Sequence, residues 1–110
     1  MARYITFFSY KGEAIKAMID RPSDRSAAAK ALVESLGGTL EAFYWMQGHH
    51  DGFLITSLPD GVTASALAAA VGATGVIGGL ETHQIFDHDE QSAIVAGAAT
   101  ALRAYKPPTA

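Results

Sequence analysis

Side chains able to transfer a proton are concentrated in two short segments of this 110-residue chain. His49, His50 and Asp51 are consecutive, and Glu81 and His83 have one residue between them. An imidazole has a pKa near 6.5, so it can give and take a proton close to neutral pH. His50 or His83 could therefore act as a general acid or base. Asp51 or Glu81 would orient the imidazole.

Each of these residues also has a structural interpretation. Asp51-Gly52 is typical of a turn, because Asp accepts local backbone hydrogen bonds and Gly adopts positive φ. His49 and His50 would point apart in an extended loop. A metal site needs a third ligand, and only Glu81 and His83 have the i, i+2 spacing that suits a strand. The chain has no cysteine. We therefore expect no metal ligands and no cofactor.

Further candidates could bind a ligand without reacting with it. The phenol of Tyr10 could donate a hydrogen bond, and Trp45 could form an apolar wall. His49 and Glu81 could contact a bound molecule. Aromatic side chains on strands lie more often in a core or an interface, so this interpretation stays open beside the functional one. Gly75 to Gly79 is not a phosphate loop, because it lacks the Lys-Ser/Thr ending and precedes a strand.

The spacing of apolar residues, with the positions of Gly and Pro, predicts four strands and four helices. The strands are expected within residues 3–10, 39–47, 53–58 and 76–86. The helices are expected over residues 13–20 and 27–36, from a cap at Asp60 or Thr63 to about residue 73, and after Asp87. Pro22 separates the first two helices, with a fresh first turn over residues 22–24. Asp87 and Glu90 have the spacing of a capping box.

This order, β-α-β-β-α-β with an extra C-terminal helix, predicts an α+β, ferredoxin-like fold in one domain. Right-handed crossovers give an antiparallel four-stranded sheet in the order 4-1-3-2, with helices on one face. The first two strands end, and the last two begin, at the same end of the sheet. That end should gather Tyr10, the loop 49–51, Glu81 and His83 into a candidate ligand site.

The other face of the sheet is not polar enough to face water. The first strand carries Ile5 and Phe7 on one side and Tyr4 and Phe8 on the other. The second is expected to place Leu40, Ala42 and Tyr44 on one face, with Phe43 and Trp45 on the opposite one. A half-solvated sheet should alternate apolar and polar residues. We therefore expect at least a homodimer through this face, using residues among Tyr4, Phe8, Phe43 and Trp45.

Composition narrows the class of protein. Hydrophobic residues make up 49% and charged residues 17%, against about 25% charged in ordinary domains, which favours self-association. The net charge of −3, without any Lys/Arg run, argues against nucleic acid. The uncharged stretch 61–80 is rich in Gly and Ala, so we expect no membrane span. The absence of cysteine and of a signal-peptide pattern favours a cytoplasmic protein.

Several separated segments resemble the GYD-domain family. The resemblance extends over residues 2–86 and rests on residues 2–6 (ARYIT), 8–10 (FSY), 24–25 (DR), 36–38 (LGG), 41–46 (EAFYWM), 48 (G) and 51–52 (DG). The family is named for a Gly-Tyr-Asp signature in the hairpin region, and here His50 stands at the tyrosine position. The resemblance implies a dimeric α/β barrel, in which two ferredoxin-like sheets face each other. It implies no particular activity.

Three functions remain open from the sequence. The first is a binding or regulatory module that holds a small, partly aromatic molecule inside the oligomer. The second is a small isomerase or cofactor-independent oxygenase that uses a histidine as acid or base. The third is a structural assembly protein.

Overall fold

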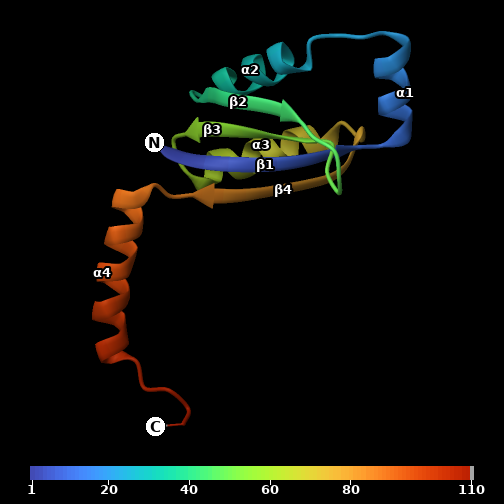
Figure 1. The fold of residues 1–110 in the computed structure, drawn as a ribbon. Helices are drawn as coiled ribbons and strands as arrows, with labels where there is room; N and C mark the ends of the chain where they lie inside the picture. The colour runs from blue at the N-terminus through green and yellow to red at the C-terminus, as the bar shows by residue number, and fades with distance from the viewer. Residues whose placement is uncertain (110) are drawn as a thin grey trace.

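Four strands form one antiparallel sheet in the computed structural model, which describes residues 1–109 (Figure 1). They are β1 (Ala2–Tyr10), β2 (Thr39–Trp45), β3 (Gly52–Leu58) and β4 (Ile77–Ile85). The strand order is β2-β3-β1-β4, and every pairing is antiparallel. The predicted sheet order and the α+β, ferredoxin-like fold are both confirmed.

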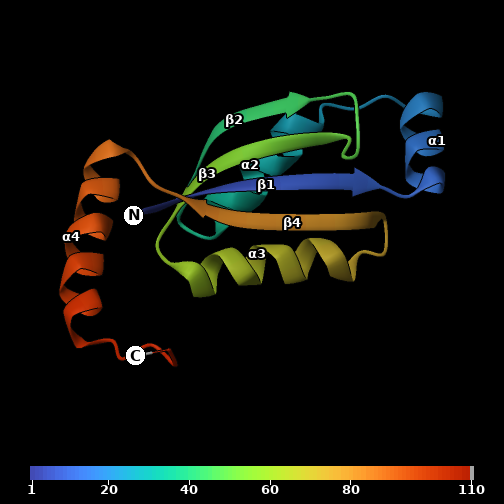
Figure 2. The same cartoon turned by 60° about the horizontal axis from the view of Figure 1, so that its bottom comes forward.

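Two helices cover one face of this sheet, and two others project from its ends. α2 (Arg25–Ser35) and α3 (Gly61–Ala73) lie on the covered face. Figures 1 and 2 show α1 (Gly12–Asp20) beyond the end of β1, and α4 (His88–Ala104) directed away from the opposite end of the sheet. None of the helices in residues 1–109 combines the length and hydrophobicity that a membrane span requires.

Aspartates begin three of the four helices. The side chains of Asp24, Asp60 and Asp87 each accept a hydrogen bond from a backbone N–H in the first turn of α2, α3 and α4. These bonds satisfy donors that a helix leaves free at its start. Glu90 completes the predicted capping box by accepting from the Asp87 N–H at 3.1 Å. α2 begins at Arg25, three residues later than the first turn predicted from Pro22, because Asp24 has the extended backbone of a cap.

The core lies between the sheet and its two covering helices, and it corrects one sequence expectation. Tyr4 and Phe8 are only 5% and 4% exposed on the helix-covered side. Residues paired across strands share a face. Phe43 pairs with Leu54, and Leu54 pairs with Thr6, which lies on the same side of β1 as Tyr4 and Phe8, so Phe43 lies on the helix-covered side too. The expectation that Tyr4, Phe8, Phe43 and Trp45 lie on the open face was therefore wrong. β1 is apolar on both sides, so its own pattern could not distinguish the two faces.

A bulge in β2 overturns the strict alternation predicted for that strand. Leu40 pairs with Thr56 while Ala42 pairs with Ile55, which leaves Glu41 as the extra residue. A bulge of one residue reverses the side to which the preceding residues point. Leu40 therefore lies on the helix side, and Ala42 lies on the open side.

The open face of the sheet is apolar at its centre. It carries Ile5, Phe7, Tyr44, Phe53 and Ile55. The ring of Phe53 lies 6.1 Å from that of Phe7 and 5.5 Å from that of Tyr44, measured between centroids. Within residues 1–109, both covering helices lie on the other side. Tyr44 is consequently 60% exposed.

The projecting helices give the chain an extended shape. The radius of gyration is 17.8 Å, against about 13 Å for a compact domain of roughly 100 residues. Neither α1 nor α4 contains a buried residue. Along α4, Ile94, Val95 and Leu102 are 44%, 57% and 74% exposed. Most helices in proteins are stabilised by packing of an apolar face, and these exposed apolar residues of α4 are available for such packing.

Candidate functional site

The loop between β2 and β3 holds Asp51 in a structural role. The Asp51 N–H donates to the Phe8 carbonyl at 2.8 Å, and the Met46 N–H donates to the Asp51 carbonyl at 2.9 Å. The Asp51 carboxylate accepts the Tyr10 N–H at 2.7 Å. This side chain therefore ties the end of β1 to the hairpin. Its role is structural, as the turn interpretation proposed, but its partner is a distant backbone N–H and not the local one expected. The carboxylate bonds to backbone and not to an imidazole.

Gly52 is a glycine because of crowding, not because of a turn. Its φ is not positive, whereas Gly48 in the same loop has φ of +125°. A Cβ atom at Gly52 would lie 2.5 Å from Phe8 Cζ and 2.5 Å from the Tyr44 carbonyl oxygen. The expectation of positive φ at Gly52 was therefore wrong. β3 packs so closely against its neighbours that only a residue without a side chain fits at position 52.

His50 lies on the open face of the sheet. Its Nδ1 is 3.1 Å from Ser9 Oγ, and its ring stacks on Phe7 with 5.4 Å between centroids. The ring of His49 contacts that of His50 edge-on at 4.7 Å. The prediction that these two rings point apart was wrong, because residues 47–51 form bends rather than an extended loop.

Glu81 and His83 form a hydrogen-bonded pair on the same face. His83 Nε2 is 2.8 Å from Glu81 Oε2, and the two side chains are 56% and 55% exposed. The hydrogen bond from His83 lowers the pKa of Glu81, and partial burial opposes this shift only in part. The His83 ring lies 6.4 Å from that of Phe7. The structure thus gathers His50, His83 and Glu81 around Phe7.

Tyr10 and Trp45 lie on the other side of the sheet. The Tyr10 ring is 6.0 Å from that of Trp45 and 5.5 Å from that of Phe8, whose side chain is in the core. Consecutive residues of a strand point to opposite faces, so Ser9 and Tyr10 belong to different surfaces. The seven predicted site residues therefore do not line one pocket. The sheet separates Tyr10 and Trp45 from the histidines.

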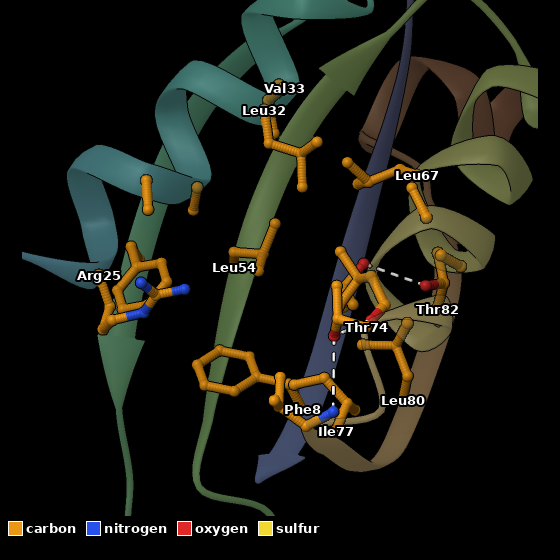
Figure 3. Close-up of a pocket in the computed structure, with 18 of the residues that line it drawn as sticks. Phe8, Arg25, Leu32, Val33, Leu54, Leu67, Thr74, Ile77, Leu80 and Thr82 are labelled. Carbon is orange, nitrogen blue, oxygen red and sulfur yellow. Dashed lines mark hydrogen bonds between the residues drawn. The ribbon is translucent and has the colours of Figure 1, made fainter. Parts of the chain in front are cut away.

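A groove on the helix-covered side was not predicted from the sequence. Its volume is about 250 Å³, and it lies between α2 and α3 (Figure 3). Phe8, Leu54 and Leu80 belong to its floor, and Leu32 and Leu67 lie on its two walls. Its walls also carry four short side chains: Ala28 and Ala29 on α2, and Ala68 and Ala70 on α3. The alanine content of both helices is the signal that could have revealed this space.

One end of the groove is polar and positively charged. Tyr10, Arg25 and Val76 line the groove and also a second hollow of about 320 Å³ beside α1. Arg21 lines this second hollow as well. No Asp or Glu is among the residues that line either space. In the sequence, Arg25 contributed to the family resemblance but was not a candidate site residue, because one arginine in the first turn of a helix is not a distinctive binding pattern.

Metal ligands do not cluster in the part of the chain that the structure describes. Residues 1–109 contain no group of three or more His, Asp or Glu side chains arranged to hold a metal ion. The pair of Glu81 and His83 supplies two such side chains, one fewer than such a group requires.

The family model for the GYD domain matches residues 4–95. The chain belongs to the GYD domain family. The matched span of this GYD domain contains the sheet except for the first two residues of β1, both covering helices and the first part of α4. No curated protein matches it. At the position that the resemblance assigns to the signature tyrosine, this GYD domain places the imidazole of His50 against Ser9 and Phe7.

Proposed function

We propose that this GYD domain is a homodimeric module that binds a small molecule in the groove between α2 and α3. The observation that carries the proposal is the groove itself, which leaves about 250 Å³ open above Phe8, Leu54 and Leu80. A close-packed interior would fill such a space. An apolar hollow with a few polar groups at one end is the usual form of a ligand site.

The chemistry of the lining favours binding over turnover. Arg25 and Tyr10 are the ionisable residues among those that line the groove. A guanidinium stays protonated at physiological pH and serves poorly as a general base. The His83–Glu81 pair lies on the open face of the sheet, so it cannot reach a molecule in the groove. The groove therefore supports recognition of a ligand without acid–base chemistry.

Two unpacked apolar surfaces support the homodimer. The open sheet face carries Phe7, Phe53 and Tyr44, and α4 exposes Ile94 and Leu102. Contiguous apolar surface of this kind usually marks an interaction site. A second copy would offer the same two surfaces, and two-fold pairing is the commonest arrangement of oligomers.

A small enzyme is the second candidate, favoured by the 2.8 Å hydrogen bond between His83 and Glu81. A carboxylate that orients an imidazole is a recurring arrangement in general-base catalysis. In a dimer formed through the open face, this pair and His50 would line the enclosed space. Under this alternative, H83Q would abolish turnover of a molecule that does not occupy the groove.

The groove can be tested with a pair of substitutions on α3. Ala68 lines the groove, whereas its neighbour Ala69 is exposed and does not. We expect 4-phenylbutan-1-ol to shift the amide NMR signals of α2 and α3 in the wild type in a saturable way. A68W should weaken this binding at least tenfold because the indole fills the space, and A69W should not. No binding to the wild type, or equal affinities of the two variants, would contradict the proposal.

A further inference from the structure

We infer that the molecule bound in the groove is an organic acid, whose carboxylate pairs with Arg25 and whose apolar body lies between α2 and α3. This inference rests on the proposed function, because it names the ligand class of the same site. The inference goes beyond the proposed function by assigning Arg25 as the residue that determines specificity.

Arg25 is positioned to meet a ligand at the end of the groove. It is the first residue of α2, its side chain is half-buried, and Figure 3 shows its guanidinium extending toward the groove. Within residues 1–109 it forms no salt bridge. The neighbouring carboxylate of Asp24 is engaged elsewhere, since it accepts from Ser26 Oγ at 2.6 Å and from the Ala27 N–H at 3.1 Å.

The charges around this end favour an anion. The protein has a net charge of −3, yet the two adjoining spaces are lined by Arg21 and Arg25 and by no acidic residue. A guanidinium presents parallel N–H donors that match the two oxygens of a carboxylate. Tyr10 lines both spaces and offers a phenol as a further donor.

The remainder of the groove favours an apolar body with a single anionic group. Its floor is formed by Phe8, Leu54 and Leu80, and Arg25 is the one charged residue that lines it. The hydroxyls of Thr6 and Thr82 lie 3.1 Å apart and hydrogen-bond to each other, which leaves them less available to a ligand. A second charge buried among these residues would lack a partner, at high cost. The ligand class is thus a small monocarboxylic acid with an aryl or alkyl body.

The inference is tested by comparing 4-phenylbutanoate with 4-phenylbutan-1-ol, which differ at the acid group. We expect the acid to bind the full-length wild type about tenfold more tightly than the alcohol, as a charge-assisted hydrogen bond would provide. R25Q should weaken binding of the acid about tenfold and leave binding of the alcohol unchanged. R103Q removes the same charge from α4 and should change neither affinity. Isothermal titration calorimetry measures the affinities of both probes for the wild type, R25Q, R103Q and A68W.

The outcomes separate this inference from the proposed function. If acid and alcohol bind the wild type equally, or R25Q weakens both alike, the inference is overturned while the groove survives through its A68W dependence. If neither probe binds the wild type, the proposed function fails. If R25Q changes the oligomeric state in light scattering and leaves acid binding intact, Arg25 pairs with a second copy, and the inference is overturned.

Discussion

Ser9 and Tyr10 are neighbours in the chain, yet they belong to two different surfaces of the molecule. Ser9 contacts His50 on the open face, and Tyr10 contacts Trp45 on the helix side. The Asp51 carboxylate accepts a hydrogen bond from the Tyr10 backbone N–H. Residues adjacent in the sequence therefore serve different parts of the molecule. Ser9 and His50 belong to the histidine cluster, Asp51 has a structural role, and Tyr10 lines the polar end of the groove.

The pKa of Glu81 should depend on His83. Because the His83 hydrogen bond lowers the pKa of Glu81 below its ordinary value of 4.5, H83L, which has no donor on its side chain, should raise it toward that value. A lowered folded-state pKa means that this carboxylate stabilises the fold above its ordinary pKa, and that the effect is lost as pH falls through the lowered value. Carbon-13 NMR titration of the side-chain carboxyl in both proteins measures the shift.

Asp60 provides the internal control for this titration. Its pKa is lowered by hydrogen bonds from the Thr63 N–H and hydroxyl, at the start of α3, so H83L should leave it unchanged. An unaltered Glu81 pKa in H83L would show that the hydrogen bond is absent in solution.

At the scale of elements, the packing of the β2–β3 hairpin depends on a glycine at position 52. In G52A the added Cβ would collide with the Phe8 ring and with the Tyr44 backbone oxygen, and the backbone atom cannot move without disturbing the β2–β3 ladder. We expect a destabilisation of about 1–3 kcal/mol, as for other overpacked cores. Urea unfolding followed by circular dichroism measures the change.

Gly12 is the matched control for this substitution. It begins α1, and a Cβ atom there would meet no atom within 4 Å. G12A should be neutral or slightly stabilising, because alanine favours the helix. Equal stability of G52A and G12A would refute the steric account of Gly52.

At the scale of the whole molecule, the unpacked surfaces predict a dimer at micromolar concentration. Phe53 lies at the centre of the open face, between Phe7 and Tyr44. F53E should produce a monomer, because an unpartnered charge is costly to bury in an interface. V62E adds the same charge to an 81% exposed residue on α3 and should remain dimeric. Light scattering distinguishes these results, and a monomeric wild type would contradict the dimer.

The sequence by itself determined the order of elements, the sheet order and the starts of α3 and α4. Those features depend on local interactions, such as the Asp60 and Asp87 caps, and on general rules of strand connection. The resemblance to the GYD domain also came from short segments of sequence.

Only the tertiary structure decided which face each side chain occupies. The apolar residues on both sides of β1 were compatible with either assignment. Tyr4 packs with Val33 and Leu67 in the core, and Phe8 is buried on the same side of the strand. The bulge at Glu41 changed the side of Leu40 relative to Ala42. The groove and the position of Arg25 at its end depend on the spacing of α2 and α3, which no local pattern encodes. A site formed between elements is decided by how those elements pack.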